Sequence, residues 1–192
     1  MKKLAIILSM LVLLLALTAC GTADNKPYQS PRPENYSFTF TDANNDGYLV
    51  EKVGKNYFNR QSALKKDKYY EYNEEKKAYD VYTRNYEEGD EWQAYETLRP
   101  LTTDDAVLGD MYAGSFFDTS ITRDFGRKPK QTGVSMFDKN NIEVYEYSGE
   151  DYYYAPDYDV FFKLTGSGKT LTWEMTSFYP NVTAFTYSVP TK

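Results

Sequence analysis

Cys20 is the only cysteine in the 192-residue chain, so it is the only thiol that could act as a nucleophile. The chain begins with the cations Lys2 and Lys3, and an almost uninterrupted apolar run extends from Leu4 to Leu17. A charged start followed by a short apolar run is typical of an export signal. The run is shorter than the roughly 20 apolar residues that a membrane-spanning helix needs. We therefore expect residues 1–19 to be a signal peptide.

The residues around the cysteine, Leu17-Thr18-Ala19-Cys20-Gly21, resemble the bacterial lipobox, in which an aliphatic residue and two small residues precede a cysteine. In lipoproteins this thiol accepts diacylglycerol and signal peptidase cuts just before it. The resemblance implies that Cys20 is the lipid attachment site and anchors the protein at the extracytoplasmic face of the cell membrane. A lipidated Cys20 leaves no thiol for disulfides, metal ligation or catalysis. The alternative is an ordinary signal peptide that contains a cysteine.

Oxygen-bearing side chains recur at alternate positions in Asp42, Asn44 and Asp46, and Gly47 follows. This spacing matches the start of a calcium-binding loop, in which carboxylate and amide oxygens bind the ion. The position that should supply a bidentate carboxylate is Val53, and the flanking residues alternate as in strands. We therefore interpret the segment as a hairpin turn, with a calcium site at Asp42, Asn44 and Asp46 as the alternative.

The segment Gly166-Ser-Gly-Lys-Thr170 resembles the end of a phosphate-binding loop. That loop needs a glycine where this chain has Lys163, and a helix must follow it. Apolar Leu171, Trp173 and Met175 instead alternate with polar residues, as in a strand. The segment is therefore interpreted as a hairpin turn, and no nucleotide cofactor is expected.

The chain has no histidine, which is the commonest general base and a common metal ligand. Its 22 basic and 28 acidic residues give a net charge of −6, which disfavours binding to nucleic acid. Carboxylates such as Glu143, Glu146 and Glu174 show no spacing that selects the acid–base pair of a glycosidase. We expect a protein without enzymatic activity, without a cofactor and without a nucleic-acid partner.

Aromatic residues are abundant, with 20 tyrosines and 11 phenylalanines. The flat rings of Trp92, Tyr152, Tyr154 and Trp173 are candidates for binding a ligand, because such rings stack on sugar rings and pack on apolar groups. Packing in the core and across strands is the alternative for the same rings.

The composition changes along the chain. Residues 20–35 are rich in Thr, Asn, Pro and Ser and are expected to form a tether, whereas residues 36–192 are expected to form one domain. Short runs with the two-residue period of strands recur through this domain. The expected strands lie at 36–41, 48–53, 57–60, 68–73, 78–83, 91–97, 134–137, 142–147, 152–155, 160–164, 171–178 and 183–189.

One segment has the pattern of a helix. Thr102-Thr-Asp-Asp105 places a capping hydroxyl and two acids where the amino end of a helix favours them. Apolar residues then recur on one helical face as far as Tyr112, and we expect a helix at 103–117. The predicted fold is mainly β, a curved antiparallel sheet or half-barrel of about ten to twelve short strands with one covering α-helix.

The tyrosine-rich strands, including Lys68-Tyr-Tyr-Glu-Tyr72, and the closing run from Tyr152-Tyr-Tyr-Ala-Pro156 through Leu171-Thr-Trp-Glu-Met-Thr-Ser177 to Phe185 look like Gram-positive lipoproteins with a half-barrel of the LolA and LppX type. That resemblance implies a concave apolar face that holds acyl chains. The density of tyrosine departs from it, because tyrosine is more polar than the lining of a lipid cavity.

Two functions follow as hypotheses. The first is a membrane-anchored protein that binds an apolar or amphipathic ligand, such as a lipid, on its curved sheet. The alternative is a carbohydrate-binding or adhesive surface module that uses exposed Tyr and Trp.

Overall fold

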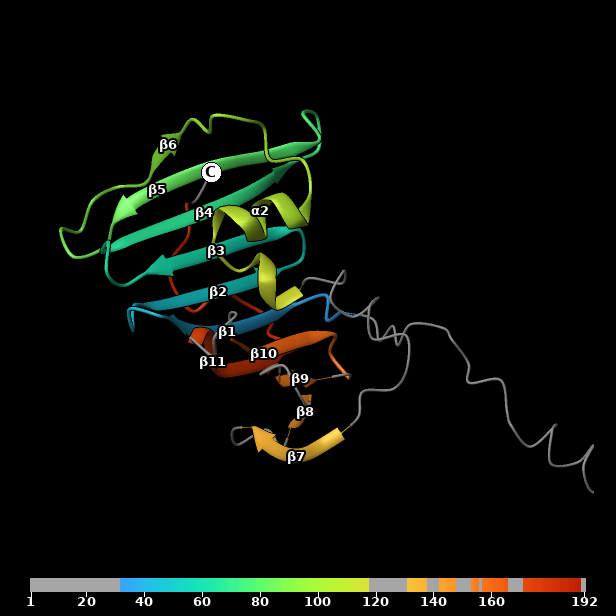
Figure 1. Cartoon of the computed structure of the whole chain (residues 1–192). Helices are drawn as coiled ribbons and strands as arrows, with labels where there is room; N and C mark the ends of the chain where they lie inside the picture. Colours follow the sequence, from blue (N-terminus) through green and yellow to red (C-terminus); the bar gives the residue numbers. More distant parts are fainter. Residues whose placement is uncertain are drawn as a thin grey trace, which may run out of the picture.

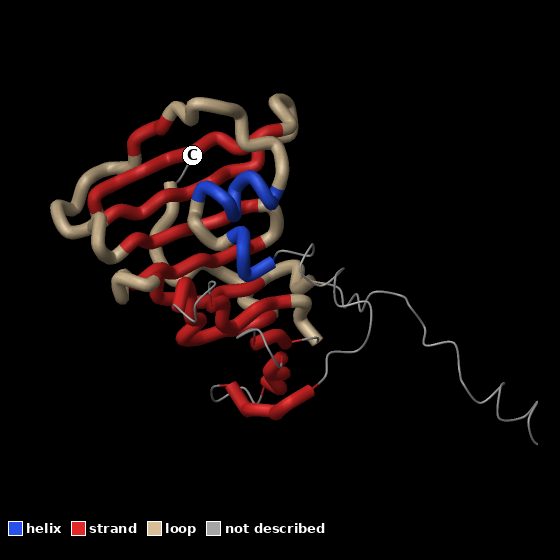
Figure 2. Tube along the Cα trace, viewed as in Figure 1, coloured by secondary structure: helices blue, strands red, loops and turns tan. Residues whose placement is uncertain are grey.

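The computed structural model describes residues 32–117, 131–137, 142–147, 153–155, 157–165 and 171–190. These residues form a mainly β structure, with one α-helix and one 3₁₀-helix lying over the sheet (Figures 1 and 2). The strands are β1 Tyr36–Asp42, β2 Gly47–Val53, β3 Asn56–Gln61, β4 Lys66–Asn73, β5 Ala78–Asn85, β6 Gln93–Tyr95, β7 Gln131–Phe137, β8 Ile142–Tyr147, β9 Tyr153–Ala155, β10 Val160–Thr165 and β11 Leu171–Pro180. The helices are α2 Asp104–Asp110 and the 3₁₀-helix η1 Gly114–Phe117.

The strands are hydrogen-bonded in the order β6-β5-β4-β3-β2-β1-β11-β10-β9-β8-β7, and all described pairs are antiparallel. Strand β11 pairs with β1, so the first strand lies in the middle of the sheet, next to the last one. Strands β6 and β7 lie at opposite ends of this order, so the described sheet is open rather than a closed barrel (Figure 1). The predicted antiparallel, mainly β fold with one helix is confirmed.

The predicted helix at 103–117 is divided in two. Thr103 caps α2, because its hydroxyl accepts a hydrogen bond from the backbone N–H of Ala106. The α-helix ends at Met111, and Tyr112 follows in the left-handed conformation, with a φ of 59°. A residue in this conformation cannot continue a right-handed helix, so the chain turns there and resumes as η1.

Helices α2 and η1 lie over one face of the sheet (Figures 1 and 2). The side chains between them and the sheet form an aromatic core. Phe38 and Phe40 on β1 are buried, and their rings lie 5.6 and 4.8 Å from that of Phe116 on η1. Val107 and Leu108 of α2 are also fully buried. Apolar side chains from the helices therefore fill the space over this face.

Two carboxylates attach α2 to the sheet, one at each end of the helix. Asp104 accepts hydrogen bonds from Lys52 and from the hydroxyl of Tyr79, each at 2.6 Å. Asp110 accepts hydrogen bonds from Lys68 at 2.8 Å and from the hydroxyl of a buried tyrosine on β4 at 2.7 Å. These contacts fix both the position and the direction of a helix only seven residues long.

The prediction of a strand at 183–189 is wrong. This segment crosses the face of the sheet opposite α2, behind the strands in Figure 1, and makes no strand pairing. Both edges of β11 are already paired, to β1 and β10, so the segment has no free strand edge beside it. Asn181 turns the chain in the left-handed conformation and donates its N–H to the carbonyl of Asn35. We call residues 182–190 the C-terminal strap.

Asn35 and Arg32 both belong to the stretch expected to be a tether. Besides its contact with Asn181, Asn35 accepts a hydrogen bond from the N–H of Gly54 at 2.7 Å. Arg32 donates to the carbonyl of Phe117 at 2.9 Å and lies over its ring. The last residues before β1 are therefore packed against the domain. Within the described residues, neither helix has the length and apolar character needed to cross a bilayer.

Candidate functional site

A groove of about 590 Å³ lies between strands β1, β2 and β11 and the C-terminal strap. It opens on the side of the sheet opposite the aromatic core, where Ser37, Thr39 and Thr41 alternate with the buried aromatics of β1. Its lining consists of Ser37, Thr39, Phe40, Thr41, Gly47, Tyr48, Leu49, Arg60, Ser62, Thr176, Ser177, Tyr179, Val182, Thr186 and Tyr187.

A cluster of three hydroxyls forms part of the groove lining between β1 and β11. Thr39 Oγ1 lies 2.6 Å from Thr176 Oγ1 and 2.6 Å from Ser177 Oγ. The register of the two strands shifts here, because Thr39 pairs with Ser177 whereas the next residue, Phe40, pairs with Met175. This bulge leaves Thr176 as the extra residue and brings two consecutive hydroxyls to one threonine. Hydroxyls both donate and accept, so the cluster can exchange hydrogen bonds with the hydroxyls of a ligand.

Two tyrosines supply aromatic surface to the same groove. Tyr179 on β11 is 46% exposed and Tyr187 on the strap is 37% exposed. Only six large apolar side chains are exposed in the described part of the chain, and these two are the ones that line the groove. Their rings offer a partly apolar surface beside the hydroxyl cluster.

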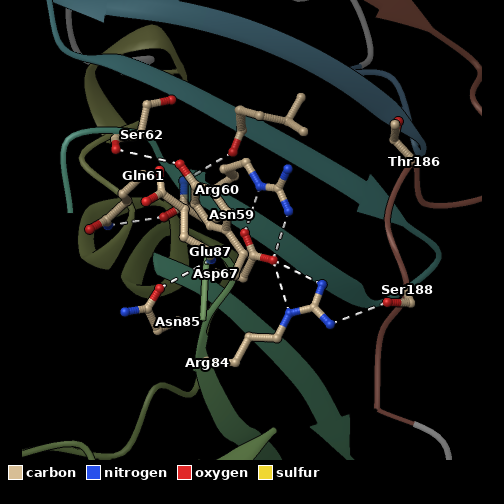
Figure 3. A network of polar contacts seen from close by, with 12 residues as sticks. Asn59, Arg60, Gln61, Ser62, Asp67, Arg84, Asn85, Glu87, Thr186 and Ser188 are labelled. Carbon is tan, nitrogen blue, oxygen red and sulfur yellow. Dashed lines mark hydrogen bonds and ion pairs between the residues drawn. The ribbon is translucent and has the colours of Figure 1, made fainter. Parts of the chain in front are cut away.

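Arg60 lines the groove from β3 and is held by a buried carboxylate (Figure 3). Asp67 is fully buried and accepts from Arg60 Nε at 2.7 Å and Nη2 at 2.9 Å, and from Arg84 Nε at 3.0 Å. The guanidinium of Arg60 also contacts two rings, with its central carbon 4.2 Å from the centroid of Tyr86 and 3.5 Å from that of Tyr187. The hydrogen bonds to Asp67 raise the pKa of Arg60 above its ordinary value, so this residue remains a cation.

Glu51 attaches the strap to the sheet. Its carboxylate is 1% exposed and accepts hydrogen bonds from the Ser37 hydroxyl at 3.2 Å and from the N–H and hydroxyl of Thr186. Arg84 adds a hydrogen bond to the hydroxyl of Ser188 at 3.2 Å. These bonds fix the strap as one wall of the groove, with Thr186 among its lining residues.

The aromatic residues proposed from the sequence as ligand-binding do not form one site. Trp92 lies on the same face as the groove but packs beside Phe58 and beneath Arg84 rather than lining it. Trp173 on β11 is partly buried against the aromatic core. Tyr154 on β9 is buried and donates its hydroxyl to an aspartate. Tyr152 lies outside the described residues.

The proposed calcium segment forms the predicted turn between β1 and β2. Asp42 Oδ1 accepts hydrogen bonds from the N–H groups of Asn44 at 2.9 Å and Asp46 at 3.0 Å. The carboxylate therefore stabilises the turn itself. Among the described residues, no cluster of three or more acidic, histidine or cysteine side chains could hold a metal.

Sequence reasoning missed most of the residues that build the groove. The alternation of β1 does predict that Ser37, Thr39 and Thr41 share a face opposite the phenylalanines. Nothing in the local sequence indicates that Thr176 and Ser177 meet Thr39, because the contact joins residues more than 130 positions apart. The place of Tyr187 depends in the same way on the path of the strap.

Strands, the strap and the turn residue Ser62 supply the lining of the groove. Comparisons of the chain with protein-family models, with curated proteins and with solved structures give no match, so the groove itself is the basis for assigning a function.

Proposed function

We propose that this protein is an extracytoplasmic lipoprotein, anchored through a lipid on Cys20, whose domain binds a polyhydroxylated ligand of the glycan class without transforming it. The ligand class is inferred from the chemistry of the residues that line the groove. Ten of its fifteen lining residues bear a hydroxyl, and none bears a carboxylate. A lining of this kind matches the many hydroxyls of a sugar.

The size and the aromatic content of the groove support the same ligand class. A volume of about 590 Å³ is within the range of small-ligand sites. The exposed ring of Tyr179 can pack against the C–H face of a sugar ring while the Thr39 cluster exchanges hydrogen bonds with its hydroxyls. A purely apolar ligand fits less well, because the apolar side of the sheet is already filled by α2 and η1.

Binding without catalysis is the form of the proposal that the lining favours. Hydrolysis of a glycosidic bond ordinarily needs two carboxyl groups on either side of the bond. The two buried carboxylates nearest the groove in the fold are Glu51 and Asp67. Both are hydrogen-bonded within the domain, and neither belongs to the lining.

Direct binding measurements test this proposal. The full-length lipidated protein, extracted in detergent, is applied to an array of neutral and acidic oligosaccharides, and affinities for the bound members are measured by calorimetry. Thr39→Val is expected to weaken binding about 3- to 10-fold, the value of roughly one hydrogen bond. Thr102→Val, which alters an exposed threonine before α2, is the matched control and should bind as the wild type does.

Two outcomes would contradict the proposal. One is an array on which no member binds. The other is a lipid that co-purifies with the protein in native mass spectrometry and occupies it at one copy per chain, since that result would support the apolar or amphipathic ligand instead.

A further inference from the structure

Arg60 is the only charged residue among those that line the groove. Its Nε and Nη2 atoms are bound to Asp67, whereas Nη1 has no hydrogen-bond partner in the described part of the chain. Figure 3 shows Nη1 turned away from Asp67. The side chain as a whole is 18% exposed, and Arg60 belongs to the lining of the groove.

The guanidinium is held rigidly before any ligand arrives. Asp67 binds it through both carboxylate oxygens, and Tyr86 and Tyr187 contact it. An arginine fixed in this way loses little conformational entropy when it binds a further group. Arg60 is therefore preorganised for binding, unlike a mobile arginine on the protein surface.

The charges around Arg60 favour an anion at this point. Asp67 is shared by two arginines, Arg60 and Arg84, so the three residues together carry one positive charge. Two carboxylates of other strands share this face: Glu51 is buried under hydrogen bonds from Ser37 and Thr186, and Glu174, which pairs with Thr41, does not belong to the groove lining. Among the residues that line the groove, the charge is therefore that of Arg60.

We infer that the ligand of the groove carries an acidic group, a carboxylate or a phosphate, and that Arg60 Nη1 binds it and so determines specificity. This inference rests on the proposed function, because it names the kind of glycan that the groove selects. A hydrogen bond from a guanidinium to an anionic oxygen is about twice as strong as one between neutral groups. Asp67 is a positioning residue that holds Arg60 for this contact.

The experiment compares matched acidic and neutral ligands on the full-length lipidated protein in detergent. The probes are uronic-acid oligosaccharides, the same oligosaccharides as methyl esters, and oligomers of a polyol phosphate. We expect an acid to bind at least 10-fold more tightly than its uncharged form, with a preference that declines as salt is added. The uronic acids and the polyol phosphates distinguish a carboxylate from a phosphate.

Two variants assign the preference to one residue. Arg60→Gln is expected to bind the acid and its methyl ester equally, while it still binds both through the hydroxyls. Lys55→Gln is the matched control, because it also removes one positive charge but at an exposed position that does not line the groove, and it should keep the preference. The near-ultraviolet circular dichroism of the tyrosines shows whether each variant is folded.

If the wild type binds the acid and its methyl ester equally, the inference is overturned but the proposed function is not. This comparison needs only the wild-type protein, so it does not depend on whether a variant folds. A preference that persists in a folded Arg60→Gln variant would also overturn it. Binding of no member of either series would reject the proposed function together with the inference.

Discussion

Tyr112 occupies a position in which glycine is the usual residue. It follows Met111, the C-cap of α2, and has a φ of 59°. Its N–H and that of Ala113 donate to the carbonyls of Gly109 and Leu108. A side chain in this left-handed conformation costs about 1 kcal/mol relative to glycine. The Tyr112 ring recovers little of that cost by burial, because the residue is 61% exposed.

We therefore expect Tyr112→Gly to raise the free energy of unfolding by about 1 kcal/mol relative to Tyr112→Ala. Both variants lose the ring, so the comparison isolates the backbone conformation. Chemical denaturation of the two proteins measures the difference. A glycine variant no more stable than the alanine variant would show that the left-handed turn costs nothing here.

Helix α2 is too short to be stable alone, and its contacts with the sheet must hold it in place. Burial acts to raise the pKa of Asp104, but the hydrogen bonds from Lys52 and Tyr79 outweigh burial and lower it below the ordinary value of 3.8. The folded state thus favours the ionised carboxylate. Its stabilising effect is fully present above the unfolded pKa and is lost as the pH falls through the lower, folded pKa.

Asp104→Asn is accordingly expected to lower the free energy of unfolding at neutral pH by about 1 kcal/mol, a modest value because the side chain is partly exposed to solvent. The difference in the free energy of unfolding between variant and wild type should remain constant down to about pH 5 and then decrease toward zero below pH 3.8. Unfolding curves across this pH range provide the measurement. Asp105→Asn, at an exposed neighbouring position, is the matched control, and an equal loss in both variants would contradict a specific role for Asp104.

At the scale of the whole molecule, the proposed lipid anchor on Cys20 would determine where the groove can act. We expect Cys20→Ser to abolish metabolic labelling with a fatty acid and to leave the protein either unprocessed or released from the membrane fraction. An acyl chain contributes about 0.8 kcal/mol per buried CH₂ group, so the loss of the lipid removes most of the membrane affinity. Fractionation with immunoblotting measures the distribution. Normal cleavage with unchanged membrane retention would reject the anchor.

Local sequence predicted the elements better than the site. Alternation placed β1 and β2 close to their observed bounds, and the Asp42 turn between them was identified, because both depend on residues adjacent in the chain. The amino end of α2 was predicted from its capping threonine. The early end of the helix at Tyr112 was missed, since a tyrosine gives no local signal for a left-handed conformation.

The strap illustrates the other kind of error. Residues 183–189 alternate as a strand does, yet the edge that such a strand would need beside β11 is occupied on both sides. The segment instead satisfies part of its hydrogen bonding through Glu51, a residue 135 positions away. A local pattern cannot report that an edge is already paired.

The sequence by itself determined the alternation of the strands, the turn after β1 and the hydroxyl-bearing face of Ser37, Thr39 and Thr41. Those features follow from interactions between near neighbours. Only the tertiary structure decided that β11 lies against β1, that a bulge brings Thr176 and Ser177 to Thr39, and that the strap closes the groove beside Arg60. Long-range pairing decides these features, because the residues that meet in the groove are brought together by the order of the strands rather than by their spacing in the chain.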